Sequence, residues 1–167
     1  CYGDGGAVFT NNDQFAEKIK MLRVHGQNKR YHYKHIGMGG RLDTIQAAIL
    51  LAKLPHYKKE LEQRDRVAKN YSNKLKGSMI LPTIRSNRSS VWAQYTVKVN
   101  NRDEVQKKLQ DDGIPTAIYY PVPLHLQECF KYLNYKKADF PVAEKSSNCV
   151  LSLPMNAYLT EEEISFI

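Results

Sequence analysis

No apolar run in this chain approaches the roughly 20 residues that a transmembrane helix needs, and no signal peptide opens the sequence. Cysteine is also scarce. The sequence has only three, Cys1, Cys129 and Cys149, an odd number with no CxxC spacing among them. This usage is typical of reduced thiols in a cytoplasmic protein. Because the chain opens on cysteine rather than methionine and stops soon after a helix start at Thr160, we expect both ends to be cuts within a longer protein.

Several catalytic motifs are missing as well. The sequence contains no Gly-x-Ser-x-Gly, no P-loop, no GxGxxG and no paired-carboxylate motif, so hydrolase, kinase and dehydrogenase chemistry have no support in it. His25, His32 and His35 lie near one another, but no carboxylate or thiolate joins them at ligand spacing. No metal site is therefore predicted.

What the sequence has in excess is positive charge. The 25 lysines and arginines outnumber the 17 aspartates and glutamates and give a net charge of +8. Such a surplus favours an anionic partner, whether nucleic acid, anionic lipid or a phosphorylated small molecule. A solvated basic surface is the alternative.

Residues 29–41 (KRYHYKHIGMGGR) place cations among tyrosines and histidines. This pattern can neutralise phosphates and stack on bases, but no helix-turn-helix, zinc finger or RNA-binding sheet motif accompanies it, so nucleic-acid binding is not favoured. The same chemistry suits one compact anion, such as the diphosphate of a nucleotide sugar. Glycines would let the backbone approach this ligand, and Arg41 offers a forked donor just before a helix N-terminus. A plain surface loop is the alternative.

A second candidate site is residues 117–127 (AIYYPVPLHLQ). A predicted strand ends in Tyr119 and Tyr120, the following Pro-Val-Pro sequence fixes a rigid turn, and His125 stands alone after it. Polar tips at a strand end often line pockets, whereas a buried aromatic pair is the alternative.

Hydrophobic periodicity predicts strands at residues 6–10, 91–99, 114–120 and 149–153. Helices are predicted after the caps Asn12, Asp43, Asn101 and Thr160, from Tyr57 to Gly77, near residues 126–133 and after Pro141. Residues 27–40 and 83–90 are predicted to be loops.

The predicted fold class is α/β. Residues 91–167 alternate strands and helices and are expected to form a small α/β domain that is truncated at its last helix. Residues 1–55 are expected to be the remnant of a larger domain, because one strand and its helices cannot cover both sides of a sheet. Residues 56–90 would be the connecting helix and linker.

CYGDGGAVFT at the start of the chain and GMGGRLDTIQAAIL from Gly37 resemble the DegT/StrS family of pyridoxal-phosphate (PLP) sugar aminotransferases. LRVHG, IYYPVPLHLQ and SLPMNAYLTEEEI also lie in the family's order, so the resemblance covers nearly the whole chain. It implies the C-terminal portion of a PLP-dependent transferase with the aspartate-aminotransferase fold (fold type I). In that family the cofactor-binding lysine lies a few residues before the YGDGG turn. No catalytic residue is therefore expected in this chain, which alone should be inactive.

The resemblance also implies a homodimer with active sites shared across the interface, in which residues 27–41 contribute to the partner's site. Arg41, Tyr119, Tyr120 and His125 would bind the substrate. Gly39 and Gly40 would bind the cofactor, pyridoxal 5'-phosphate. Many members have Asn in place of Gly39, so the contact of that Asn with the cofactor phosphate must come from backbone here or be lost.

IYYPVPLHLQ is similar to the same segment in enzymes that aminate UDP-linked 3-keto sugars, such as the 3-oxo-glucuronate aminotransferases of surface-polysaccharide synthesis. Glutamate would be the amino donor. Two alternatives stay open: a PLP-dependent sugar dehydratase of the same family, which has histidine at the lysine position, and a basic nucleic-acid or regulatory binding module.

Overall fold

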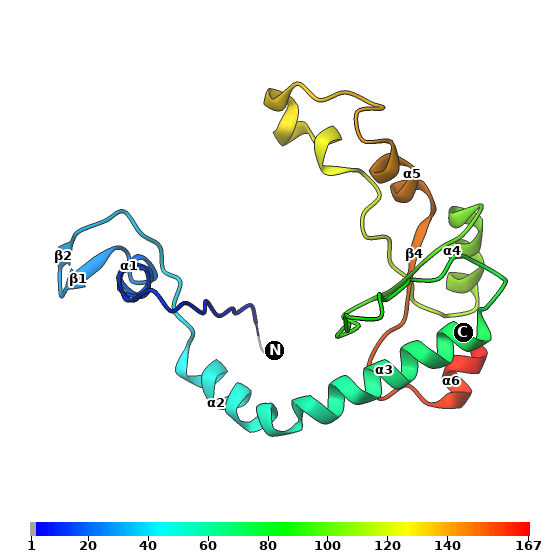
Figure 1. Cartoon of the computed structure of the whole chain (residues 1–167), viewed down its shortest axis with the longest axis horizontal. Helices are drawn as coiled ribbons and strands as arrows, with labels where there is room; N and C mark the ends of the chain where they lie inside the picture. Colours follow the sequence, from blue (N-terminus) through cyan, green and yellow to red (C-terminus); the bar gives the residue numbers. More distant parts are fainter. Residues whose placement is uncertain (1–2) are drawn as a thin grey trace. The chain divides into compact units, whose positions relative to one another are not determined.

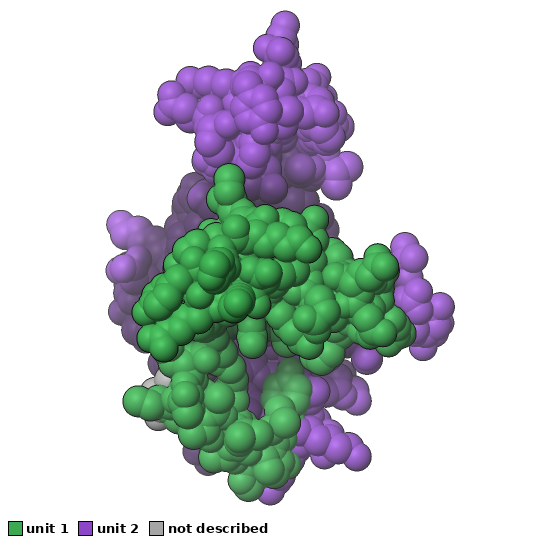
Figure 2. All heavy atoms as spheres, turned by 90° about the vertical axis from the view of Figure 1, so that its left-hand side faces the viewer, with its two compact units in different colours: residues 1–57 green, residues 58–167 purple. Residues whose placement is uncertain are grey.

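The structure, a computed structural model, describes residues 3–167 and divides the chain into two compact units, residues 1–57 and 58–167 (Figures 1 and 2). Within the described residues, no helix is both long enough and apolar enough to cross a membrane. In chain order the elements are α1 (Asp13–Leu22), β1 (Gln27–Lys29), β2 (His32–Tyr33), α2 (Thr44–Lys53), η1 (Leu54–His56), α3 (Tyr57–Lys74), β3 (Tyr95–Lys98), α4 (Arg102–Asp111), η2 (Leu124–Leu126), η3 (Glu128–Leu133), α5 (Pro141–Cys149), β4 (Val150–Leu153) and α6 (Glu161–Phe166).

Side-chain caps start both helices of unit 1, as the sequence predicts. The Asn12 carboxamide oxygen accepts a hydrogen bond from the Phe15 backbone N–H at 3.0 Å and so begins α1. Asp43 and Gln46 form a capping box at the start of α2, in which the Gln46 Oε1 accepts from the Asp43 N–H at 3.2 Å. These bonds satisfy backbone donors that a helix start leaves unpaired.

Two predictions for unit 1 are wrong. Residues 6–10 form no strand, and Val8 and Phe9 are 66% and 91% exposed, because no strand pairs with this segment within residues 3–57. Residues 27–40 are not wholly a loop, since β1 and β2 form an antiparallel hairpin. The hairpin escaped prediction because its residues are almost all exposed on both faces and so show no alternation of apolar and polar positions.

Two glycines let the segment after the hairpin return past the end of α1. A Cβ on Gly26 would lie 1.7 Å from the His35 carbonyl oxygen, and a Cβ on Gly37 would lie 2.3 Å from the Gly26 nitrogen. Gly26 also has a φ of +79°, which favours glycine. The Met38 N–H then donates to the Leu22 carbonyl at 2.9 Å. Backbone contact of this kind fixes the path of residues 34–40.

The core of unit 2 is an antiparallel pair of strands with α3 against it (Figure 1). β3 and β4 pair from Tyr95 with Leu153 to Lys98 with Val150, and single bridges add Ile80 beside β3 and Ala117 beside β4. The buried hydrophobic residues of this cluster are Val67, Ala68, Tyr71, Trp92, Tyr95, Val97, Val99, Leu151, Leu153, Leu159 and Ile164. The strand prediction at residues 149–153 is therefore confirmed within one residue.

Buried tyrosines bind α3 to the strands through both ring and hydroxyl. The Tyr71 and Tyr95 rings lie 5.1 Å apart, the Tyr71 hydroxyl donates to the Pro154 carbonyl at 2.9 Å, and the Tyr95 and Ser72 hydroxyls lie 2.8 Å apart. Burial raises the pKa of Tyr71 to about 12, so this hydroxyl keeps its proton and remains a donor.

Other boundaries in unit 2 differ from the predictions. The strand predicted at residues 91–99 shortens to Tyr95–Lys98, because Trp92 has a φ of +48° that interrupts extended backbone. The strand predicted at residues 114–120 reduces to the bridge at Ala117, since prolines at positions 115 and 121 limit ladder donors.

The two predicted capping boxes of unit 2 have opposite outcomes. Asn101 is the N-cap residue of α4, as predicted, but it adopts a left-handed conformation (φ +52°, ψ +43°) and makes no side-chain cap bond, so the predicted capping box is wrong. Thr160 and Glu163 form the predicted box on α6, with the Thr160 N–H donating to the Glu163 carboxylate at 2.8 Å.

Truncating Leu151, which is fully buried on β4, should destabilise unit 2. We expect Leu151→Ala in the complete protein to lower the opening free energy of the β3 and β4 amides by about 2–5 kcal/mol, because it leaves a cavity in the core. Hydrogen exchange measures this quantity. Val142→Ala, at a 77% exposed position, is the control. Equal exchange in both variants would contradict the central role of β4.

Candidate functional site

A cavity of about 370 Å³ in unit 2 has two of the predicted substrate residues in its wall. One wall is the segment after the Ala117 bridge, and the other is α5 with the start of β4. The lining residues are Tyr119, Tyr120, Pro121, Val122, Pro123, Leu124, Gln127, Ala143, Ser146, Ser147 and Val150. We call this the tyrosine cavity; its size is in the range of small-molecule sites.

Tyr119 and Tyr120 present accessible side chains at the tyrosine cavity. They are 43% and 70% exposed, and their rings meet edge to face with centroids 5.6 Å apart. The alternative of a buried aromatic pair therefore does not describe them. Edge-to-face packing is a favourable arrangement of two rings, and each phenol group can serve as both donor and acceptor.

His125 lies differently from the two tyrosines. Its side chain is only 8% exposed and is not part of the lining of the tyrosine cavity. The His125 Nε2 lies 3.0 Å from a Glu144 carboxylate oxygen, and its ring packs on Phe140 at 4.8 Å between centroids. The structure therefore gives this side chain a protein partner on α5.

The Glu144 carboxylate accepts hydrogen bonds from two separate segments. The sequence patterns did not predict Glu144 as a site residue. Besides His125, its carboxylate accepts from the Ala138 N–H at 2.8 and 3.0 Å and from the Phe140 N–H at 3.4 Å. We call Glu144, His125, Ala138 and Phe140 the Glu144 cluster. The sequence feature that could have indicated Glu144 is its place in the first turn of a helix that begins at a proline. Glutamates at such positions are common on solvated helices, so this feature alone does not indicate a site.

The hydrogen bond from the Ala138 backbone holds the pKa of Glu144 below its ordinary value, with smaller contributions in the same direction from His125 and Phe140. Partial desolvation opposes them. Glu144 is therefore a carboxylate, and an acceptor only, at neutral pH. Because it cannot donate, the Nε2 of His125 must carry the proton of their bond.

Arg41, Gly39 and Gly40 belong to unit 1. All three are exposed, and Arg41 stands two residues before Asp43, the N-cap of α2. The Gly40 N–H donates to the Arg23 carbonyl at 2.9 Å. A Cβ on Gly39 would lie 3.3 Å from the His25 ring, so the missing side chain keeps this backbone open.

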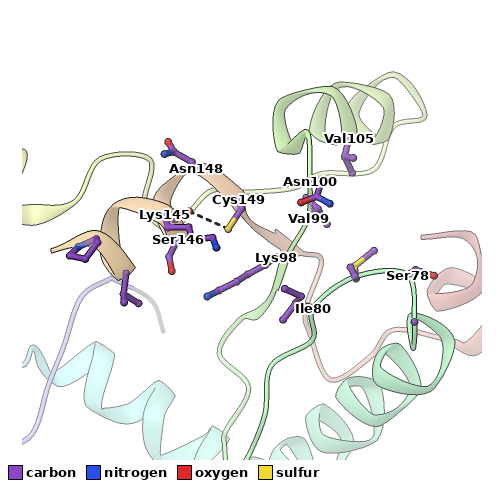
Figure 3. A pocket seen from close by; sticks show the side chains of 14 residues that line it. Ser78, Ile80, Lys98, Val99, Asn100, Val105, Lys145, Ser146, Asn148 and Cys149 are labelled. Atoms are coloured by element: carbon purple, nitrogen blue, oxygen red, sulfur yellow. Dashed lines mark hydrogen bonds between the residues drawn. The ribbon is translucent and has the colours of Figure 1, made fainter. Parts of the chain in front are cut away.

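A larger hollow of about 1070 Å³ contains none of the predicted site residues. Lys98, Asn100, Lys145 and Asn148 contribute polar groups to its wall, with the thiol of Cys149 held toward the Lys145 carbonyl at 3.2 Å (Figure 3). Among residues 3–167, every buried side-chain nitrogen or oxygen has a hydrogen-bond partner, so no polar group here requires a ligand. Nor does any group of three or more His, Cys, Asp or Glu in that part of the chain suit a metal ion.

All 167 residues match the DegT/DnrJ/EryC1/StrS aminotransferase family, and the chain belongs to this family. The resemblance predicted from the motifs is thereby confirmed. The chain is 46% identical over 168 residues to the UDP-2-acetamido-2-deoxy-3-oxo-D-glucuronate aminotransferase of Pseudomonas aeruginosa, covering all of this chain and 46% of that protein. It is 40% identical to a UDP-N-acetyl-3-dehydro-alpha-D-glucosamine 3-aminotransferase of Acidithiobacillus ferrooxidans, covering 99% and 44%.

The fold agrees with the family assignment. The crystal structure of DesV from S. venezuelae in complex with a ketimine intermediate superposes with a TM-score of 0.88 at 32% identity, over 93% of this chain and 43% of that one. The predicted α/β class, as part of a fold type I transferase, is confirmed. The chain spans less than half the length of the curated relatives that it matches here.

The lowered pKa of Glu144 predicts a pH-dependent contribution to stability. Because folding depresses this pKa, the contribution is complete above the unfolded value, near 4.5, and disappears as pH falls through the folded value. Glu144→Gln should therefore lower the thermal unfolding midpoint of the complete protein more at pH 7 than at pH 4. Glu128→Gln, whose carboxylate is 90% exposed, should change neither midpoint. An equal loss at both pH values would contradict the prediction.

Proposed function

We propose that the complete protein is a PLP-dependent aminotransferase that moves an amino group from glutamate to a UDP-linked 3-keto sugar. One observation carries the proposal: the family match runs over all 167 residues, with 46% identity to a relative named for a UDP-linked 3-oxo-glucuronate. The relatives' names also support a role in making amino sugars. We propose surface-polysaccharide or amino-sugar biosynthesis as the pathway.

Aminotransferases of this family depend on PLP, and unit 1 fits part of a site for it. The exposed backbone at Gly39, together with Gly40 and the guanidinium of Arg41 just before α2, suits a phosphate rather than the whole cofactor. The family's lysine has no counterpart among these 167 residues. When bound, PLP supplies an electron sink for the transfer of the amino group. In this proposal Gly39 and Gly40 contribute backbone near its phosphate.

Residues of this chain would then bind and orient the sugar. The hydroxyls of Tyr119 and Tyr120 can both donate to and accept from a polyhydroxylated ring, and both side chains are accessible at the tyrosine cavity. Arg41 would hold an anionic group of the substrate or cofactor through a charge-assisted contact. His125 is the remaining predicted substrate residue, and its bond to Glu144 supports an indirect role instead.

We further propose a cytoplasmic homodimer in which residues 27–41 enter the partner's active site. Exposed apolar side chains in this segment support the proposal: Ile36 is 100% exposed and Met38 is 71% exposed. A large exposed apolar surface beside charged residues is typical of an interface.

The complete protein, supplied with PLP, glutamate and a UDP-3-keto sugar, should form the 3-amino sugar and one equivalent of 2-oxoglutarate. Mass spectrometry of both products measures this. Loss of water from the sugar without any need for glutamate would instead identify the related dehydratase. Salt-sensitive binding of mixed DNA, without binding of the UDP-sugar, would favour the nucleic-acid module.

Replacing Arg41 should weaken catalysis without dissociating the protein. We expect Arg41→Ala in the complete enzyme to lower kcat/KM by a factor equivalent to about 2–4 kcal/mol, since a charge-assisted contact is lost. Steady-state kinetics measures the change, and Arg88→Ala, at an exposed loop position, is the matched control. Unchanged kinetics would exclude the role, and loss of the dimer would indicate a structural ion pair.

A further inference from the structure

The Glu144 cluster connects the two walls of the tyrosine cavity. Ala143, Ser146 and Ser147 on α5 line one wall, and Glu144 stands among them in the sequence while its side chain turns to His125 instead. His125 lies between Leu124 and Gln127, which line the opposite wall. The 3.0 Å bond between the two side chains therefore joins the walls beside the cavity.

The wall that contains Tyr119 and Tyr120 has few other attachments. Residues 119–140 contain only the short turns η2 and η3, whose hydrogen bonds are local. Across the described residues, the side-chain hydrogen bonds that join this segment to α5 all end on the Glu144 carboxylate. Ring packing adds to them, because Phe140 contacts both His125 and Tyr135, with centroids 4.8 and 5.0 Å away.

The helix on the other side of the bond is itself fixed. The Arg102 guanidinium, on α4, donates to the carbonyls of Ser147 and Val150 at 3.0 and 3.4 Å, which holds the C-terminal end of α5. The Ser147 carbonyl is one that the end of a helix leaves unpaired, and the Val150 carbonyl belongs to the first residue of β4. Val150 then continues directly into β4, the buried strand of the core. Glu144 thus ties a segment of irregular structure to a helix anchored in the sheet.

We infer that Glu144, acting through His125, is a positioning residue that holds Tyr119 and Tyr120 at the distance from α5 that the nucleotide-linked sugar requires. The inference rests on the proposed function and deepens it by separating residues that touch the sugar from residues that hold them. Neither Glu144 nor His125 contacts the substrate in this arrangement. Loss of their bond loosens one wall of the cavity and leaves the glutamate reaction intact.

The test uses the complete enzyme and four variants: Glu144→Ala, His125→Ala, the double variant and His125→Gln. Glu144→Ala should raise the KM for the UDP-3-keto sugar about tenfold, as expected for loss of a partly buried charge-assisted hydrogen bond. The release of 2-oxoglutarate from glutamate in a single turnover should change by less than about twofold. Hydrogen exchange of residues 119–127 should become faster, which requires no catalysis.

Two comparisons separate positioning from direct contact. If the pair acts through one bond, the double variant is no worse than either single variant, whereas an independent substrate contact by His125 gives additive losses. His125→Gln keeps an amide donor near the position of Nε2 and should recover part of the affinity that His125→Ala loses. Glu128→Ala, which removes an exposed carboxylate paired with Lys131 at 3.2 Å, is the control and should match the unaltered enzyme.

Unchanged hydrogen exchange and KM in Glu144→Ala would overturn the inference, as would additive losses in the double variant or equal failure of both half-reactions. A separate outcome tests the proposed function rather than this inference. If the unaltered enzyme aminates no UDP-3-keto sugar, that function fails, while the exchange of residues 119–127 still decides whether Glu144 holds this wall.

Discussion

The antiparallel pairing of β3 with β4 is the interaction on which unit 2 depends. Val97 and Leu151, paired across the two strands, are both fully buried against α3. β4 also sets both walls of the tyrosine cavity: α5 runs directly into it at Val150, and Ser152 pairs with Ala117, where the tyrosine segment begins. Any shift in the register of β4 would therefore move α5 and the tyrosines together, because a one-residue slip exchanges the faces of a strand.

Much of the helical structure could be predicted because its signals are local. Asn12, Asp43 and Thr160 lie within three residues of the donors that they cap or the partners that complete their boxes. Strands were harder, since a strand exists only where another strand pairs with it. Residues 6–10 have a strand-like composition but pair with no strand among residues 3–57. Trp92, with its positive φ, continues an alternating sequence pattern that the backbone does not follow.

The candidate site shows the same limit of sequence-based prediction, that contacts between residues far apart in the chain cannot be predicted from local patterns. Tyr119 and Tyr120 could be predicted from a strand end followed by prolines, and the structure agrees that they line a cavity. Glu144 could not, because its partners lie at His125, Ala138 and Phe140, and a loop of irregular structure separates it from the first of these. No periodicity indicates which distant imidazole a helix carboxylate will contact. Only the three-dimensional path of residues 119–140 brings them together.

In the proposed function, the bond from His125 to Glu144 also bears on which side chains would contact the sugar. Because Nε2–H donates its hydrogen bond to the Glu144 carboxylate and Phe140 packs on the ring, this nitrogen is already engaged within the protein. Tyr119 and Tyr120, by contrast, have exposed side chains, and a phenol can act as donor or acceptor. A polyhydroxylated ring presents groups of both kinds, so phenols that adapt to either role suit it better than a histidine fixed as a donor. We therefore propose that the tyrosines recognise the sugar and that the histidine holds their wall in place.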